Sequence, residues 1–368
     1  MILAPICFAA APAHAQAAVE PCGDCLGIRS ELRVGDDAGP GRLDRGLASW
    51  ARDSRGRIYV SGGSFGKLRV FGADGRFLRI LPERAPSDTA EWVPGLVAIT
   101  PGDTVHLVDD LSGQHQVLDP SFRPVRTLTV SPFLRASAMM LVLPGDTLFG
   151  SGTVATRDGI GYPLHFLSPK GDVVRSFGTD SPDVSPSAPP SLRKLAPAGA
   201  GRFWAGELTR YRVERWTADG RRDAVIEREV PWFPAYARMG QQRGEAPKPL
   251  LMAVRQDSAG RLWTVVRVAD PRWSEARAAP VDSSLARRSP LAPYDLNQIY
   301  DTVVEVFAPG CTRPAASQRF PQLFAGFLDD RHLVEWRVLN ANAPARLGVW
   351  RIELNIPPAG EHPCNASS

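Results

Sequence analysis

A short pattern that recurs six times along the chain restricts its fold more than any other feature. The first copy has a polar turn and an apolar run at residues 53–60, a second run at 68–71, an Asp-Gly pair at 74–75 and a third run at 76–80. The residues equivalent to Ile58 in the later copies are Val105, Leu148, Phe203, Leu262 and Leu333. Repeats spaced by roughly 40–70 residues indicate one small structural unit that is copied and stacked side by side.

Each copy has the pattern of a small antiparallel sheet. Apolar and polar side chains alternate, as in Leu68-Arg69-Val70, and a period of two residues is typical of a half-buried strand rather than a helix. Asp-Gly pairs separate the runs at 74–75 and 219–220. Glycine supplies the positive φ that a tight hairpin turn requires. The repeats therefore predict an all-β chain.

The number of copies predicts how the sheets close into a ring. The sixth copy has only three strands, whereas an unattached strand-like segment lies at 28–34. We expect this segment to complete the last sheet, because closure removes an edge that would promote aggregation. The predicted fold is a six-bladed β-propeller of four-stranded antiparallel blades, with the last blade closed by the N-terminal strand. The blades are expected at about 43–82, 91–130, 136–178, 192–230, 251–320 and 324–354.

The repeat also resembles a known group of proteins. Asp-x-x-Gly-Arg-Ile-Tyr-Val at 53–60, followed by Val-Phe-x-x-Asp-Gly at 70–75, is similar to the NHL-repeat group of six-bladed β-propellers, which the TolB-like propellers resemble in architecture. The glycine-rich segment 28–46 is similar to the lead-in of those repeats. The resemblance covers most of residues 28–354 and implies an architecture rather than an activity. Copies three, four and six depart from the pattern, and residues 328–331 lack the turn glycine.

The N-terminal residues predict export. Residues 2–13 are apolar and rich in alanine, and Ala13-His14-Ala15 fits a cleavage site before Gln16, although no basic residue precedes the apolar run. We interpret 1–15 as a signal peptide, 16–360 as a single propeller domain and 361–368 as a C-terminal tail. No apolar stretch of about 18 residues is present, so no transmembrane span is predicted. The expected location is periplasmic or extracellular.

The cysteines agree with an oxidising compartment. Cleavage removes Cys7, an alternative lipid-anchor site, and leaves Cys22, Cys25, Cys311 and Cys364. Four cysteines in an exported chain predict two disulfides, with three possible pairings. Bonds from the N-terminal pair to Cys311 and Cys364 would hold the ring together where its two ends meet. A redox or zinc motif is the alternative, but no second Cys-x-x-Cys sequence or neighbouring histidine supports it.

Loop lengths predict which face of the propeller binds a ligand. In each blade the turns after the first and third strands emerge on one face, and the remaining connections emerge on the other. The long connections 179–191, 231–249 and 268–300, and a loop at 157–162, belong to the second face, the long-loop face. Aromatic and arginine side chains on loops are common in binding sites, although they also pack loops against a scaffold. The candidate ligand-binding residues are Tyr162, Trp232, Phe233, Tyr236, Arg238, Trp273, Tyr294 and Tyr300.

The central channel offers little acid–base or metal chemistry. Its innermost strands are expected at Leu47–Arg52, Gly95–Ile99, Ala136–Leu143, Leu192–Ala196, Leu251–Gln256 and Phe324–Leu328. These ranges contain Arg52, Arg193, Lys194 and Arg255 but no aspartate, glutamate or asparagine, whereas calcium needs several oxygen ligands, as in the propeller lactonases. No HExxH or His-x-His motif is present. We therefore predict no catalytic residue, metal or cofactor, and a channel that allows an anionic ligand.

Three functions are compatible with these observations. The favoured hypothesis is a non-catalytic exported propeller that binds a protein, peptide or glycan through its long-loop face. One alternative is a hydrolase or lyase with its site at the channel mouth, but catalysis usually needs a positioned acid, base or nucleophile. The other alternative is an envelope scaffold without a small ligand. The net charge of +4 is spread along the chain, which argues against a nucleic-acid partner, and we expect a monomer.

Overall fold

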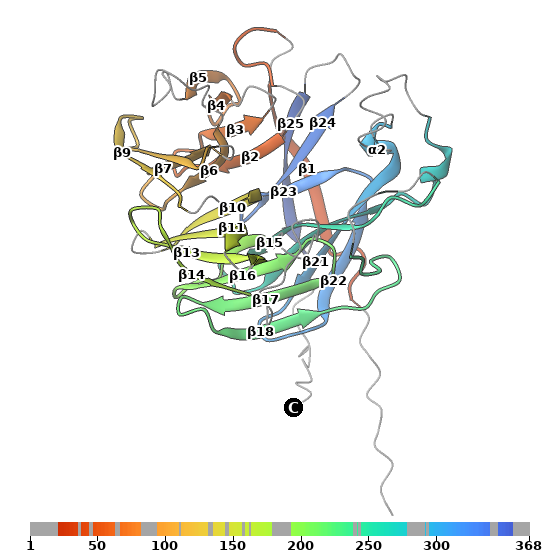
Figure 1. Cartoon of the computed structure of the whole chain (residues 1–368). Helices are drawn as coiled ribbons and strands as arrows, with labels where there is room; N and C mark the ends of the chain where they lie inside the picture. Colours follow the sequence, from red (N-terminus) through yellow and green to blue (C-terminus); the bar gives the residue numbers. More distant parts are fainter. Residues whose placement is uncertain are drawn as a thin grey trace, which may run out of the picture.

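The chain folds into six antiparallel sheets arranged in a closed ring (Figure 1). This confirms the predicted all-β, six-bladed propeller with four-stranded blades. The computed structural model describes residues 21–35, 38–43, 47–62, 67–81, 94–109, 112–131, 135–143, 147–156, 159–161, 163–178, 193–237, 241, 244–277, 291, 294–338 and 345–355.

The strands of each blade follow one another from the centre of the ring outward. Blade one contains β2 (Leu47–Arg52), β3 (Ile58–Gly62), β4 (Lys67–Phe71) and β5 (Phe77–Leu81), and blade two contains β6 (Pro94–Ile99), β7 (Val105–Asp109), β8 (Gln114–Leu118) and β9 (Pro124–Thr129). Blade three contains β10 (Arg135–Leu143), β11 (Thr147–Thr156), β13 (Leu164–Leu167) and β14 (Val173–Phe177), with the short β12 (Gly159–Gly161) paired to β11.

The second half of the ring repeats this order. Blade four contains β15 (Arg193–Pro197), β16 (Arg202–Glu207), β17 (Arg212–Thr217) and β18 (Arg222–Glu227), and blade five contains β19 (Leu250–Gln256), β20 (Leu262–Ala269), β21 (Tyr300–Phe307) and β22 (Pro314–Phe320). Blade six contains β23 (Phe324–Asp329), β24 (His332–Val338), β25 (Ala345–Leu354) and β1 (Leu26–Val34).

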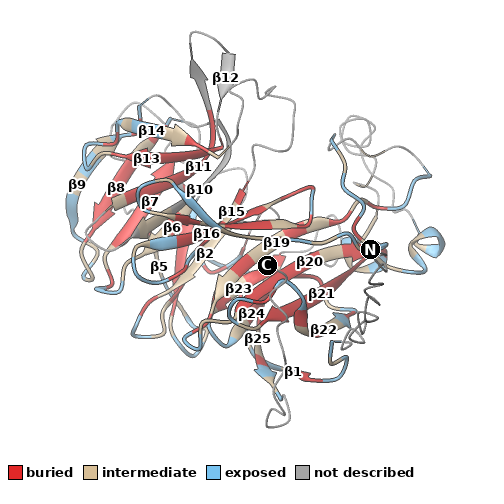
Figure 2. Ribbon diagram, turned by 90° about the horizontal axis from the view of Figure 1, so that it is seen from below, coloured by how far each residue is buried: buried red, intermediate tan, exposed pale blue. Residues whose placement is uncertain are grey.

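The innermost strands hold the ring together. Each of β2, β6, β10, β15 and β19 contacts the innermost strand of the next blade, and β23 contacts β2. The six innermost strands that the sequence predicts are confirmed to within one residue at each end. The strands carry most of the residues coloured as buried in Figure 2. Buried apolar side chains of neighbouring blades form shared clusters, such as the one that joins Tyr211 and Val213 of blade four to Leu251 of blade five, as expected when sheets pack face to face.

The first strand closes the last blade, as predicted. β1 pairs antiparallel with β25 from Leu26 opposite Leu354 to Val34 opposite Leu347, with a bulge between Ser30 and Leu32. The two strands lie side by side in Figure 1. Pairing β1 with β25 satisfies the backbone groups that an open outer edge would expose.

The cysteine pairing differs from the expected one. Cys22 and Cys25 are bonded to each other, with 5.7 Å between their Cα atoms, so bonds from this pair to Cys311 and Cys364 do not form. Only two residues separate the cysteines, and Gly23 has open space around its Cα atom, so the local loop closes without help from distant segments. Cys311 is also disulfide-bonded, and Cys364 lies outside the described residues.

Backbone hydrogen bonds nevertheless bring the N-terminal segment to blade five. The Cys22 amide donates to the Ala315 carbonyl at 3.0 Å, and the Ser317 amide donates to the Cys22 carbonyl at 3.0 Å. The segment therefore contacts β22 before β1 joins blade six. This arrangement connects the two blades at the point where the ring closes.

Two long connections rise from blades four and five on the long-loop face. One joins β18 to β19 over residues 228–249, and the other joins β20 to β21 over 270–299. The described part of the second connection contains a short 3-10 helix, η2 (Trp273–Glu275), and a short α-helix, α2 (Leu296–Ile299). The Asp295 side chain caps α2 by accepting a hydrogen bond from the Asn297 amide at 3.0 Å.

Candidate functional site

The predicted aromatic residues form two packed groups instead of one continuous rim. In the first group, the ring centroids of Trp232 and Phe233 lie 5.7 Å and 5.6 Å from that of Tyr211. Phe233 is only 2% exposed, and Trp232 is half-buried. These contacts fold the 228–249 connection down onto blade four.

The second group surrounds Tyr300 at the start of β21. Trp273 and Tyr294 pack against a buried cluster formed by Ile299, Tyr300 and Leu323. Tyr300 is 4% exposed, whereas Trp273 and Tyr294 are half-buried. Tyr162 and Arg238 lie outside the described residues.

Tyr236 and Tyr300 tie the two long connections to the backbone that enters blade five. The Tyr236 hydroxyl donates to the Pro249 carbonyl at 2.6 Å, and the Tyr300 hydroxyl donates to the Lys248 carbonyl at 3.4 Å. Burial raises the pKa of both phenols. Their hydroxyl groups are therefore neutral donors that position the backbone near the start of β19.

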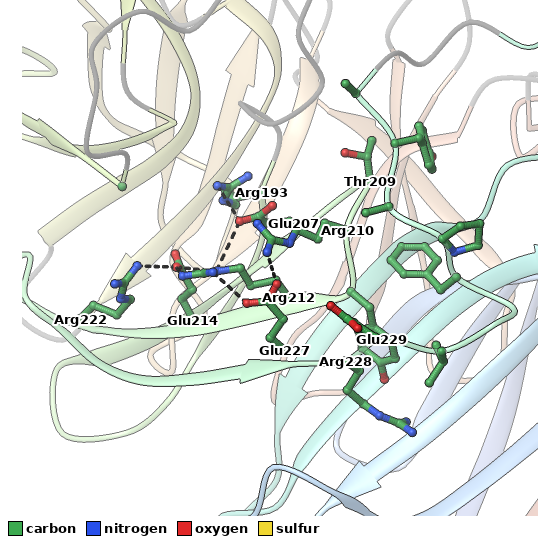
Figure 3. A pocket seen from close by; sticks show the side chains of 18 of the residues that line it. Arg193, Glu207, Thr209, Arg210, Arg212, Glu214, Arg222, Glu227, Arg228 and Glu229 are labelled. Carbon is green, nitrogen blue, oxygen red and sulfur yellow. Dashed lines mark hydrogen bonds and ion pairs between the residues drawn. The ribbon is translucent and has the colours of Figure 1, made fainter.

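A wide cavity lies on the long-loop face beside blade four (Figure 3). Its volume is about 1270 Å³. Its wall runs from Phe177 at the end of β14, across the ends of the blade-four strands, to the 228–237 part of the connection. An aromatic cluster supports this wall, because the Phe177 and Trp216 rings lie 5.2 Å apart between blades three and four.

Alternating arginine and glutamate side chains line the cavity. Arg212 lies at the centre of the group: it donates to Glu214 at 2.8 Å and to Glu227 at 2.9 Å, and its guanidinium is 3.7 Å from Glu207 (Figure 3). Arg222 donates to the same Glu214 oxygen at 2.8 Å. One carboxylate oxygen of Glu214 thus accepts hydrogen bonds from two guanidinium groups. Hydrogen bonds between charged groups are stronger than those between neutral groups.

The deepest ion pair of the cavity joins Arg193 to Glu207. The Arg193 guanidinium donates to the Glu207 carboxylate at 3.2 Å, and only 4% of its side chain is exposed. Burial lowers the pKa of Arg193 and raises the pKa of Glu207. Each group depends on the other to remain charged, so the pair forms a structural floor rather than a free acid or base.

A second buried carboxylate, Glu305 of β21, lies on the other side of this wall. It is 1% exposed and accepts hydrogen bonds from Tyr211, Arg228 and Ser317. Arg228 accordingly points away from the arginine–glutamate group toward blade five (Figure 3). This network fixes the beginning of the 228–249 connection.

The rim of the cavity is more accessible. Arg210, which pairs with Glu227, and Glu229 are both exposed. Sequence reasoning did not single out this group, because it concentrated on aromatic residues in long loops. The signal was present in the period-two order Arg210, Arg212, Glu214, which places all three on one side of an extended segment.

The innermost strand of blade six ends at an acidic residue that the predicted strand did not include. β23 extends to Asp329, one residue beyond the predicted strand, and the Asp329 carboxylate accepts a hydrogen bond from Arg52 at 2.9 Å. Arg255 likewise pairs with Asp330. The prediction that the innermost strands carry no acid is therefore wrong at this position, and these two arginines are neutralised.

The described residues contain no cluster of three or more His, Cys, Asp or Glu side chains that could hold a metal ion. Among those same residues, no helix is long and apolar enough to cross a membrane. The arrangement found in the cavity suits recognition of polar groups, because its donors and acceptors are held in place by one another.

Comparison with known proteins identifies the class of fold. No protein-family model and no curated protein matches the chain. The fold is similar to that of a member of the DUF4221 family from Bacteroides vulgatus, with a TM-score of 0.57 and 9% identity over 89% of this chain and 99% of that one. It is also similar to a protein from Bacteroides fragilis assigned as exported, with a TM-score of 0.55 and 8% identity over 90% of this chain and 98% of that one.

A virginiamycin B lyase from Staphylococcus aureus is a more distant match. Its TM-score is 0.47 and its identity 9%, over 89% of this chain and 99% of the lyase. At such low identity the likenesses to the two Bacteroides proteins extend to the fold alone.

Proposed function

We propose that this protein is a non-catalytic, exported β-propeller that binds a protein, peptide or glycan through its long-loop face, within the wider NHL-like group of propellers. The main contact is the cavity beside blade four. The observation that carries the proposal is the combination of its size, about 1270 Å³, with its lining of mutually paired arginine and glutamate side chains. Pockets for small ligands are usually about 300–1,000 Å³ and mostly apolar, so an extended polar ligand fits this site better.

The rim supplies the groups that a ligand would meet first. Arg210 and Glu229 are exposed, and the half-buried Trp232, Tyr236 and Trp273 present partial aromatic surfaces next to the cavity or on the neighbouring connection. A ligand with both amide and charged groups can pair with such a surface while the buried ion pairs keep its shape. Phe233 contributes indirectly, by holding the connection in place.

The two alternative functions, an enzyme and an envelope scaffold, have different structural requirements. A hydrolase or lyase requires a positioned acid or base that is free to transfer a proton. Three of the four described carboxylates that line the cavity, Glu207, Glu214 and Glu227, are paired with arginines, and the fourth, Glu229, lies on the exposed rim. An envelope scaffold without a ligand requires no defined recognition surface. Export agrees with the apolar N-terminal residues 1–15, which lie outside the described residues.

The test uses peptide and glycan arrays probed with the purified mature protein. Wild type is compared with the double variant Arg210→Ala/Glu229→Ala, whose exposed side chains cost little stability when removed. The matched control is Arg123→Ala, an exposed arginine in the turn between β8 and β9 on the opposite face. We expect the double variant to lose about tenfold or more in affinity for the array ligand, equivalent to about 1.4 kcal/mol, and the control to bind normally.

Equal binding by all three proteins would refute the cavity as the binding site. The mass of the bound ligand is then measured after prolonged incubation with wild type. An unchanged mass supports binding without catalysis, and a cleaved or eliminated product would favour the enzyme alternative.

A further inference from the structure

The floor of the cavity is the face of blade four that meets blade three. In the ladder between β16 and β17, Glu214 lies opposite Ala205 and Trp216 lies opposite Phe203. Both partner residues and Trp216 belong to a buried cluster that also contains Phe177 of blade three. Because alternate residues of a strand share one face of the sheet, Glu214 and Trp216 both face blade three.

Two buried polar atoms on this floor have no hydrogen-bond partner among the residues that the structure describes. They are Oε2 of Glu214 and Nε1 of Trp216, whose residues line the cavity and are only 2% and 7% exposed. The other oxygen of the Glu214 carboxylate already accepts from Arg212 and Arg222. An acceptor and a donor that are buried without partners cost stability, so the floor is suited to a ligand that supplies one donor and one acceptor.

The charges of the described lining balance one another. The lining contains five arginines and four glutamates, and one of these arginines, Arg228, pairs with Glu305 outside the lining. Three of the glutamates pair with arginines, and the fourth, Glu229, lies on the exposed rim. A charged ligand group at the floor would have to displace a partner that is already in place, and no free counter-charge among the described residues would offset the loss of its hydration. The floor therefore favours a ligand that is polar but uncharged.

The connection from β18 to β19 gives the cavity an apolar side. Pro231, Pro234 and Ala235 line the cavity and are exposed, and Tyr236 lines it half-buried. The Tyr236 hydroxyl already donates to the Pro249 carbonyl, so its ring is the part that a ligand can contact. The cavity thus combines a floor of fixed donors and acceptors with an apolar side.

We propose that the cavity beside blade four binds an uncharged oligosaccharide. This inference rests on the proposed function and names the chemical class of its ligand. A sugar hydroxyl both donates and accepts hydrogen bonds, so one hydroxyl can donate to Glu214 Oε2 while another accepts from the Trp216 N–H. The C–H face of the sugar ring contacts the apolar side. The volume of about 1270 Å³ exceeds that of a usual small-ligand pocket, so several linked rings fit.

A peptide matches these features less well than a sugar does. Its backbone carries donors and acceptors on separate atoms, whereas each hydroxyl can serve an arginine and a glutamate at the same time. Its ionised termini and side chains would meet no free counter-charge at the floor. A peptide is therefore the main competing ligand in the test.

The experiment measures by titration calorimetry how the purified protein binds neutral hexasaccharides of glucose, mannose, galactose and N-acetylglucosamine. A hexamer of galacturonic acid and a blocked peptide of alternating glycine and asparagine are the comparison ligands. One test variant is Trp216→Phe, which removes the unpaired N–H and keeps an aromatic ring. The other is Arg222→Met, which removes a partly exposed guanidinium that binds Glu214. The matched control is Trp204→Phe in β16, because the Trp204 N–H already donates to Gln256 at 2.7 Å and its side chain packs toward blade five.

We expect at least one neutral hexasaccharide to bind wild type and the control equally, and each test variant to bind it about fivefold to tenfold more weakly, as for the loss of one hydrogen bond. Thermal unfolding without ligand gives a second readout. Trp204→Phe should lower Tm more than Trp216→Phe does, because only the control breaks a hydrogen bond that is already formed. A larger loss of Tm in Trp216→Phe would overturn the unpaired donor on which the inference depends.

The remaining outcomes separate this inference from the proposed function. Peptide binding that is lost in the two test variants would overturn the choice of a sugar and leave the cavity as the binding site. Tighter binding of the galacturonic acid hexamer than of any neutral hexasaccharide would overturn the requirement for an uncharged ligand. If no neutral hexasaccharide binds wild type, or if all variants bind it equally, the inference is wrong. The array experiment with Arg210→Ala/Glu229→Ala still decides independently whether the cavity binds another ligand.

Discussion

Replacing Gly171 with alanine should weaken the contact between blades two and three. Gly171 lies in the turn between β13 and β14, with a φ of +95°. A Cβ atom there would lie 2.5 Å from the Thr129 carbonyl oxygen of blade two. The same turn is bonded to blade two through Ser131, whose amide donates to the Gly171 carbonyl at 3.0 Å and whose carbonyl accepts from the Val173 amide at 2.7 Å.

Gly310 provides a matched control in the equivalent turn of blade five. Its φ is +76°, and nothing lies within 4 Å of the position that a Cβ atom would take. Alanine at either position costs about 1–2 kcal/mol for the left-handed backbone. At Gly171 the clash with backbone atoms adds the cost of overpacking, about 1–3 kcal/mol. We therefore expect Gly171→Ala to lose about 2–5 kcal/mol of unfolding free energy, and Gly310→Ala to lose about 1–2 kcal/mol.

The measurement is urea denaturation of wild type and both variants, with midpoints and slopes compared. Hydrogen exchange at β9 and β14 adds a local measure, since only Gly171→Ala should increase exchange there. Equal losses of stability in the two variants would show that the turn does not clamp blade three to blade two. The physical basis of the prediction, a backbone approach that only glycine permits, would then be wrong.

Two further predictions concern pH. His332 donates through its two ring nitrogens to Asp329 at 2.6 Å and to Glu31 at 2.9 Å, and the hydrogen bond to Asp329 raises the pKa of His332. The contribution of protonated His332 to the free energy of unfolding is complete below about pH 6.5 and is lost as the pH rises through the raised pKa. His332→Gln should therefore cost about 1–3 kcal/mol at pH 6 and little at pH 9, measured by urea denaturation. A loss of stability that does not depend on pH would contradict this prediction. Burial and the neighbouring Asp270 raise the pKa of Asp301 to about 6. Wild type should therefore lose stability as the pH rises from about 4 to 6, because the folded state then gives up a proton that it holds more tightly than the unfolded chain. Asp301→Asn should flatten this slope in thermal unfolding, and an unchanged slope would contradict the prediction.

Local sequence was enough to predict the blades. Strands such as Leu47–Arg52 follow from alternating side chains and from turns in which glycine adopts a positive φ, and these are interactions between residues close in the chain. The missing strand of blade six could be predicted for the same reason, because a sheet with three strands leaves an edge that must be covered. The bond between Cys22 and Cys25 was not predicted, since composition allowed several pairings and the structure joins the two cysteines that are neighbours in the sequence.

The side chains that form the site could not be selected in this way. Phe233 and Tyr300 were predicted on an accessible rim, yet tertiary packing buries both. Arg212 has its full set of three carboxylate neighbours only when β16, β17 and β18 lie side by side. The sequence by itself determined the repeated strands, because their hydrogen bonds and periodicity are local; the tertiary structure decided burial and charge pairing, because these arise between residues that only the closed ring brings together.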